Sequence, residues 1–383
     1  MSDLFKPAPE PKTELGRYRV LSSLAGIRCS PLQLGAMSIG DAWSGFMGSM
    51  SKEQSFKLLD AFYDAGGNFI DTANNYQNEQ SETWIGEWMK ERDNRDYMVI
   101  ATKFTTPYKT GSGKAQAVNF CGNHKRSLHM SLRDSLKKLQ TDWIDILYVH
   151  WWDWSTSVEE MMDSLDEVVK QGKVLYLGIS DTPAYIVSMA NTYAKAHGKT
   201  PFAVYQGRWN VMVRDLEREI LPMCRLFGMA IAPWDVIGGG RFQTKKQMEE
   251  RQKSGEGIRT MLGGSEQSEN EKKVSAALEE VANELGKSIS AVALAYVMSM
   301  APNVFPIVGG RKVEHLMDNI ESLKIKLTDE HIKKLEAAVP FNVGFPMDFI
   351  GEDPHTNGGK SAFLTASAAP LAWVQSAKSI AHQ

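Results

Sequence analysis

The chain has 383 residues, 43% of them hydrophobic, with 43 basic and 46 acidic side chains and a net charge of −3. This balance argues against a nucleic-acid-binding or polybasic membrane-binding surface. Three widely spaced cysteines argue against a disulfide framework, and we see neither a signal peptide nor an apolar run of the roughly 20 residues that span a bilayer. We therefore expect a cytoplasmic protein.

In chain order, the first predicted unit is an N-terminal arm, residues 1–30, whose stretch 17–29 could cap one end of the domain. From residue 32 onward, short apolar runs alternate with amphipathic helical patterns. Most of the runs are continuously apolar, as parallel strands covered on both faces are. The eight predicted strands are 32–37, 68–71, 97–102, 144–149, 174–179, 203–206, 229–234 and 304–308.

The segments between these strands have helical periodicity. The clearest places Val158, Met161, Met162 and Leu165 at steps of three and four, on one face of a helix. Eight strand–helix alternations predict a (β/α)8 barrel, also called a TIM barrel, over residues 31–339. A doubly wound open sheet is the alternative.

Two further segments lie outside the repeat. Residues 241–272, after the seventh strand, form an unusually long charged loop, and such loops are usually functional. Residues 340–383 mix aromatic side chains with glycine and proline, and we expect this tail to pack on the barrel. We predict no second domain.

The active site of a barrel lies at the C-terminal ends of its strands. Asp71, Lys103 and His150 stand at three such ends, and Tyr76 follows five residues after Asp71. An ammonium group lowers the pKa of an adjacent phenol, a carboxylate holds the ammonium, and an imidazole can donate to a carbonyl. We predict that this tetrad delivers a proton to a carbonyl oxygen while a hydride reaches its carbon. A structural ion pair between Asp71 and Lys103, and a packing role for His150, are the alternatives.

Glycine-rich segments follow the last two strands, at 238–241 and 309–312. Barrels often bind phosphate with these two loops, and Arg311 and Lys312 add positive charge. Glycine-rich turns with solvated cations are the alternative. The chain has neither a Rossmann fingerprint nor a P-loop. We predict no metal site, because no familiar zinc spacing occurs in the nearest cluster, Cys121, His124 and His129.

Aromatic side chains crowd the same end of the predicted barrel. Such residues often only pack the rim, but here they flank the predicted proton donor, which favours a flat apolar substrate. Trp234, at the end of the seventh strand, could stack on a planar ring of a cofactor. The expected substrate contacts are Trp43, Tyr76, His150, Trp151 and Trp152.

Several of these motifs carry a family resemblance. The segments DTANNY (71–76), HWW (150–152), GISD (178–181) and PIVGGR (306–311) resemble those of the aldo-keto reductases. Within that family, LGAMSIGD and IAPWDV resemble the branch of fungal aryl-alcohol dehydrogenases and norsolorinic acid reductases. The resemblance runs from residue 32 to residue 335.

The resemblance implies a metal-free, NADP(H)-dependent reductase with Tyr76 as proton donor. The chain has Asp181 where relatives carry asparagine. It has His315 where many relatives carry arginine or glutamine, so the preference for NADP over NAD rests mainly on Arg311 and Lys312. The implied cofactor contacts are Asp71, Ser180, Asp181, Gln206, Trp234, Asp235, Val236, Gly238, Gly239, Gly240, Arg241, Gly309, Gly310, Arg311, Lys312, His315, Asp318 and Asn319.

The implied activity is the interconversion of aromatic aldehydes or ketones and the corresponding alcohols. A ketoreductase of a polyketide pathway, of the norsolorinic acid type, is the alternative within this class. A non-catalytic NADP-binding auxiliary subunit is the alternative outside it, because a fold does not fix a function. The residues leave open the physiological substrate, the direction of the reaction and the oligomeric state.

Overall fold

The computed structural model describes residues 5–254 and 266–380, and its centre is a sheet of eight parallel strands. The strands are β3 (Gln33–Gly35), β4 (Phe69–Asp71), β5 (Val99–Phe104), β6 (Ile144–Val149), β7 (Val174–Ser180), β8 (Phe202–Arg208), β9 (Ala230–Trp234) and β10 (Ile307–Val308). Their spatial order follows the chain from β3 to β9, with β10 beside β3. No reversal of order occurs, so the fold is a (β/α)8 barrel and the open-sheet alternative is wrong.

The barrel closes at its weakest point next to Pro306. There β10 has only two residues, and its link to β9 is a single parallel bridge between Ile231 and Val304. Proline has no N–H to donate to a ladder, which explains why the predicted strand 304–308 is interrupted. Its carbonyl still accepts from the backbone N–H of Gln33 at 2.9 Å.

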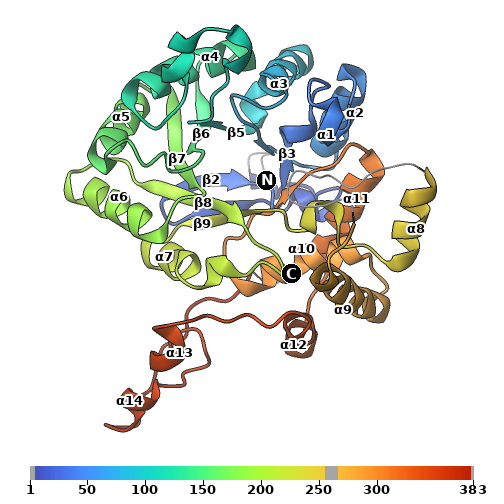
Figure 1. Cartoon of the computed structure of the whole chain (residues 1–383), viewed down its shortest axis with the longest axis vertical. Helices are drawn as coiled ribbons and strands as arrows, with labels where there is room; N and C mark the ends of the chain where they lie inside the picture. The colour runs from blue at the N-terminus through green and yellow to red at the C-terminus, as the bar shows by residue number, and fades with distance from the viewer. Residues whose placement is uncertain (1–4, 255–265, 381–383) are drawn as a thin grey trace.

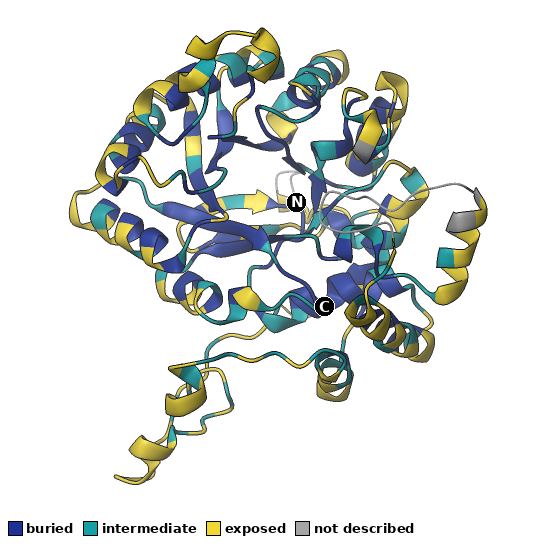
Figure 2. Ribbon diagram, viewed as in Figure 1, coloured by how far each residue is buried: buried dark blue, intermediate teal, exposed yellow. Residues whose placement is uncertain are grey.

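The helices surround the strands and bury the faces that they turn toward the barrel (Figures 1 and 2). In α5 the buried side chains include Val158, Met161, Met162 and Leu165, as the periodicity predicted. The helices are α1 (Ser44–Met47), α2 (Lys52–Asp64), α3 (Gln80–Arg92), α4 (Lys125–Leu139), α5 (Val158–Lys170), α6 (Ala184–Ala196), α7 (Ile220–Phe227), α8 (Lys245–Ser254), α9 (Glu269–Leu285), α10 (Ile289–Met300), α11 (Val313–Glu321), α12 (Asp329–Ala337), α13 (Met347–Ile350) and α14 (Phe363–Ala366). No described helix is both long enough and apolar enough to cross a membrane.

Short 3-10 turns join many of these elements. They are η2 (Glu14–Gly16), η3 (Ala36–Ser38), η4 (Arg95–Tyr97), η5 (Thr110–Ser112), η6 (Ala115–Phe120), η7 (Asp215–Glu217), η8 (Gly238–Gly240) and η9 (Ser322–Lys324). The turn η4 occupies the start of the predicted strand 97–102, so β5 begins two residues later than expected.

The N-terminal arm forms an antiparallel hairpin of β1 (Arg19–Ser22) and β2 (Ala25–Cys29). Its Leu21 and Cys29 belong to the same buried cluster as Phe69, the first residue of β4, and Phe305. The hairpin therefore packs against the end where the strands begin and leaves the opposite end open.

The long segment after β9 is partly helical. It contains α8 and the start of α9, and its residues 255–265 lie outside the described residues. Arg241, at its beginning, is buried and donates to the backbone carbonyl of Glu266 at 3.1 Å. The two described ends of the predicted loop are thus joined.

The C-terminal tail corrects one expectation. Only its first part meets the barrel, where Arg218 donates to the carbonyls of Asn342 and Val343 and Arg225 lies 3.5 Å from Asp353. Beyond that point the chain extends away from the barrel and is mostly exposed (Figures 1 and 2). Aromatic content suggested packing on the barrel, but the aromatic rings here pair within the tail itself, as Phe349 does with Phe363.

Candidate active site

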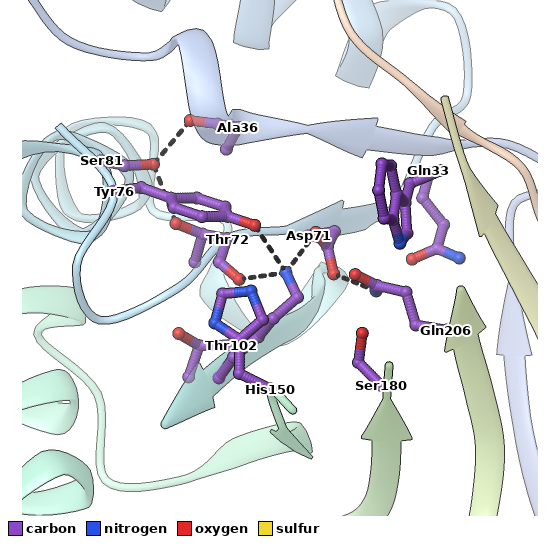
Figure 3. Close-up of polar contacts among 12 residues, drawn as sticks. Gln33, Ala36, Asp71, Thr72, Tyr76, Ser81, Thr102, His150, Ser180 and Gln206 are labelled. Atoms are coloured by element: carbon purple, nitrogen blue, oxygen red, sulfur yellow. Dashed lines mark hydrogen bonds and ion pairs between the residues drawn. The ribbon is translucent and has the colours of Figure 1, made fainter. Parts of the chain in front are cut away.

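The predicted tetrad meets at the open end of the barrel (Figure 3). Asp71 ends β4, Lys103 lies near the end of β5, and His150 directly follows β6. Tyr76 lies in the turn between β4 and α3. In Figure 3 the Tyr76 hydroxyl and the Asp71 carboxylate point toward one place, with the His150 ring beside them.

Lys103 links the group together. Its side chain is fully buried, and its ammonium donates to Asp71 Oδ1 at 2.6 Å, to the Thr72 carbonyl at 2.7 Å and to the Tyr76 hydroxyl at 3.4 Å. Gln206 Nε2 donates to the other oxygen of Asp71 at 2.9 Å. The ion pair between Asp71 and Lys103 is therefore real, and it also aims a cation at the phenol.

The protonation states follow from burial and from this cation. Burial raises the pKa of Tyr76 and outweighs the lowering effect of Lys103, so the net direction is opposite to the sequence prediction. Burial, aided by Lys103, holds the pKa of His150 well below its usual range. Burial opposes the charge of Lys103, but Asp71 outweighs it and the pKa of Lys103 is raised. Near neutral pH the site thus presents a protonated phenol, a neutral imidazole and an ammonium.

One cavity of about 580 Å³ opens beside these residues. It is lined by every predicted cofactor contact except Ser180, which is fully buried and donates from Oγ to Asp181 Oδ2 at 3.0 Å. The cavity also has lining residues that the sequence did not indicate: Met37, Ser38, Met47, Asn75, Thr106, Arg208, Phe242, Gln247, Ser288 and Ser290.

The cavity extends to both glycine-rich segments. Gly238, Gly239 and Gly240 have φ values of 60°, 62° and 85°, a region that favours glycine, and form the tight turn η8. At the far side Arg311 and Lys312 line the cavity just before α11 begins. Two glycine-rich turns, which let a ligand approach the backbone closely, and two cations suit the phosphates of a dinucleotide, so the residues present fit such a cofactor.

Two further carboxylates line the cavity. Asp235 has a positive φ of 60° and accepts from Arg208 Nε at 2.7 Å. Asp181 accepts from Ser180 and from Trp234 Nε1, at 3.3 Å for the latter. Burial raises the pKa of Asp181 to about 6. Arg208 was missed because β8 runs two residues beyond its predicted end at 206.

The aromatic residues predicted to contact the substrate lie in different places. Trp43 lines the cavity, with its ring centroid 6.2 Å from that of Tyr76, and Tyr76 lies 5.9 Å from His150. Trp152 is instead buried in the main hydrophobic core, and Trp151 lines a separate pocket beside Cys121. Neither Trp151 nor Trp152 lines the cavity beside the tetrad, and their contact with a substrate stays a prediction.

The described residues contain no group of three or more His, Cys, Asp or Glu that could hold a metal ion. In the cluster considered above, His124 caps α4 by accepting from the backbone N–H of Ser127 at 3.2 Å. Its imidazole has a local structural role.

The barrel and a cavity that fits a dinucleotide define a class: an oxidoreductase that depends on a nicotinamide cofactor. The chain belongs to the aldo/keto reductase family, whose model matches residues 31–340. It is 59% identical over 382 residues to aldo-keto reductase ausK of Aspergillus calidoustus, covering 99% of this chain and 96% of that protein.

Two other relatives carry names that state an activity. The chain is 56% identical over 362 residues to the aryl-alcohol dehydrogenase (NADP+) of Phanerodontia chrysosporium, covering 93% of this chain and 94% of that protein. It is 50% identical over 347 residues to the norsolorinic acid reductase of Aspergillus flavus, covering 91% and 87% respectively. The resemblance to this branch is confirmed.

Proposed function

We propose that this chain is an NADP(H)-dependent reductase that interconverts aromatic aldehydes or ketones and the corresponding alcohols. The observation that carries the proposal is the ammonium of Lys103, which contacts both Asp71 Oδ1 and the Tyr76 hydroxyl beside a cavity lined by His150. The naming of one relative as an aryl-alcohol dehydrogenase (NADP+) supports the substrate and the cofactor.

The chain's own residues handle the proton. The neutral Tyr76 hydroxyl donates to the substrate oxygen, and Lys103 stabilises the phenolate that remains. Asp71 and Gln206 hold Lys103 in place. NADPH supplies the hydride when bound. His150 orients the carbonyl by hydrogen bonding to its oxygen.

The residues that would hold the cofactor lie along the cavity. Asp181 and Gln206 would face the nicotinamide end together with Trp234, while η8 and Arg241 would contact the pyrophosphate. Arg311 and Lys312 would meet the 2′-phosphate, with His315, Asp318 and Asn319 around the adenine end.

The substrate side of the cavity is apolar and aromatic. Trp43 lies there with its ring centroid 6.2 Å from that of Tyr76, which suits a flat arene. Norsolorinic acid, the substrate that the name of another relative states, is the second candidate, favoured by the 50% identity to that relative.

The chain's location is proposed to be the cytosol. Cys29, Cys121 and Cys224 are all free in the structure, and two of them are buried. Free thiols of this kind suit a reducing compartment.

The test is spectrophotometric. Purified protein is mixed with NADPH and either a panel of aryl aldehydes and aryl ketones or norsolorinic acid, and NADPH absorbance is followed. Substrate-dependent oxidation is expected with at least one class. No oxidation across the panel, combined with very slow exchange of bound nucleotide, would instead support a non-catalytic nucleotide-binding subunit.

A further inference from the structure

Thr106 is a cavity residue to which the proposed reaction gives no role. It follows β5 by two residues, and its hydroxyl oxygen lies 3.0 Å from His150 Nδ1. Trp151 Nε1 donates to the same hydroxyl at 3.0 Å from the outer side of the loop. The three side chains form a line that ends on the imidazole of the tetrad.

The direction of hydrogen bonding along this line follows from the indole. An indole N–H can only donate, so Thr106 Oγ1 is the acceptor of that bond. A hydroxyl carries one proton, and among the described residues the only acceptor that it reaches is His150 Nδ1. If the hydroxyl donates there, Nδ1 carries no proton.

The protonation state of the ring completes the argument. Burial and the nearby Lys103 hold the pKa of His150 well below its usual range, so the ring is neutral and has one N–H. With Nδ1 accepting from Thr106, that N–H must be on Nε2. Within the part of the chain that the structure describes, Nε2 has no protein partner, and the ring lines the cavity.

The opposite tautomer is disfavoured by the same contacts. An Nδ1–H would donate to Thr106 Oγ1, which would then accept two hydrogen bonds and leave its own proton without an acceptor. Nε2 would present a lone pair to the cavity, where it would repel a carbonyl oxygen. Only the Nε2–H form both satisfies Thr106 and donates to a carbonyl.

We propose that Thr106, itself held by Trp151, is a positioning residue that fixes His150 as the Nε2–H tautomer and so makes the ring a donor to the substrate oxygen. The tautomer itself depends only on contacts within this chain. Its consequence for turnover rests on the proposed function.

The experiment compares Thr106→Val, which keeps the shape but removes the hydroxyl, with Thr106→Ser, which keeps the hydroxyl. In protein labelled with ¹⁵N-histidine, NMR distinguishes a protonated from an unprotonated ring nitrogen, and a His150→Gln variant assigns the signal. We expect an Nε2–H, unprotonated Nδ1 pattern in the wild type and in Thr106→Ser, and a tautomer mixture in Thr106→Val.

The kinetic arm uses the same variants. In Thr106→Val we expect a fall of about ten- to a hundredfold in kcat/KM for carbonyl reduction, with unchanged nucleotide affinity, whereas Thr106→Ser stays within about threefold of the wild type. The control is Thr156→Val, since the hydroxyl of this buried threonine binds Asp153 rather than the ring. This control is expected to leave the His150 signal in place.

Should Thr106→Val not fold, Trp151→Phe keeps an aromatic ring but removes the indole N–H that Thr106 accepts, and it is expected to broaden or shift the same signal. An Nδ1–H pattern in the wild type, or an unchanged His150 signal in Thr106→Val, overturns the proposal. An Nε2–H pattern lost in Thr106→Val without any turnover of the wild type supports the tautomer assignment and counts against the proposed function alone.

Discussion

At the residue scale, the chemistry depends on which groups accept the three hydrogen bonds of the Lys103 ammonium. Two go to Asp71 and the Thr72 carbonyl at short distance, and the third reaches the Tyr76 hydroxyl at the longer 3.4 Å. A cation held mainly by other groups can strengthen its bond to the phenol once the phenol loses its proton. This makes the arrangement more favourable for the phenolate than for the resting state, which is what a proton donor requires.

Tyr76→Phe removes this proton donor and keeps the ring that packs against Trp43 and His150. Turnover is expected to fall by at least about a hundredfold, the usual scale for loss of a general acid. Nucleotide affinity should change little, because the hydroxyl faces the substrate. Tyr97→Phe, at a site where the ring is 69% exposed, is the control. Turnover of Tyr76→Phe near the wild-type rate would show that another group gives the proton.

Asp181 makes the protein sensitive to pH. Its pKa is raised to about 6 in the fold, above the ordinary value of 3.8, mainly by burial. Between about pH 4 and 6 the folded state therefore holds a proton that the unfolded state has lost, and the contribution of this group to stability falls as the pH rises. At pH 7 the carboxylate is charged in both states, and the cost of partly removing it from water is present.

Asp181→Asn removes that cost. Because Asp181 is open to the cavity, we expect a modest effect: relative to wild type, the free energy of unfolding of the variant rises by about 1 kcal/mol between pH 4.5 and 7. Denaturant titrations at the two pH values measure it. Asp96→Asn, at an exposed carboxylate, is the control. A difference between variant and wild type that is constant with pH would contradict the assignment.

The residues of the tetrad could be predicted from the sequence because each stands at a strand end, and the barrel brings strand ends together. The direction of the Tyr76 pKa shift could not, since it depends on how completely the ring is buried. The same limit explains Trp151 and Trp152. Sequence adjacency to His150 placed them at the rim, whereas the direction of each side chain is set by packing of the whole loop.

At the element scale, the helices could be located from periodicity more reliably than the strands from apolar runs. A helix is defined over many residues, as in α5, while β3 and β10 have only three and two residues in the ladder. Pro306 was visible in the sequence as a defect of the last strand, and the structure shows how the barrel tolerates it. A single bridge to Val304 and the contacts of the neighbouring strands are enough to close the ring.

The contact between α3 and α4 offers a sharp test of packing at this scale. A Cβ atom on Gly86 would lie 2.2 Å from the Lys138 carbonyl oxygen and 2.7 Å from backbone atoms of Leu139. Gly→Ala inside a helix normally stabilises a protein by about 1 kcal/mol. Here we expect Gly86→Ala to lower the free energy of unfolding by about 2 kcal/mol, because backbone atoms of α4 cannot move aside cheaply.

Chemical denaturation of Gly86→Ala measures this change. The control is Gly26→Ala on β2, where a Cβ would meet nothing within 4 Å, and it is expected to be neutral or slightly stabilising. A Gly86→Ala variant as stable as the wild type would mean that α3 and α4 lie farther apart than the structure has them.

At the scale of the whole molecule, the two ends of the barrel have different roles. The N-terminal hairpin fills the end where the strands begin, and the cavity opens at the end where they finish. The sequence predicted the end with the active site, because the eightfold repeat fixes where strands finish, but it predicted only that the arm could cap one end, without saying which. It could not place the tail, since residues outside a repeat are positioned by contacts that no periodicity encodes.

The prediction at this scale therefore concerns the tail. Among the described residues, the ion pair of Asp353 with Arg225 is the last polar contact along the tail with the barrel, and no described residue beyond 340 lines the cavity. Truncation after Asp353 is expected to leave turnover within about twofold and the melting temperature within about 2 °C of the full chain, since little apolar surface of the barrel is uncovered. Truncation after Pro340 additionally removes Phe341, whose ring lies 4.6 Å from the Arg218 guanidinium, and should cost about 1 kcal/mol.

Thermal melting and NADPH-linked turnover of both truncated chains check these two expectations against each other. Truncation after Asp353 could instead abolish turnover without changing the melting temperature. The exposed segment from 354 onward would then have to act on the cavity of another molecule. Val374, which is 84% exposed, would then mark the surface involved. Unchanged turnover in both instead leaves the barrel, its hairpin and the cavity sufficient for the reaction.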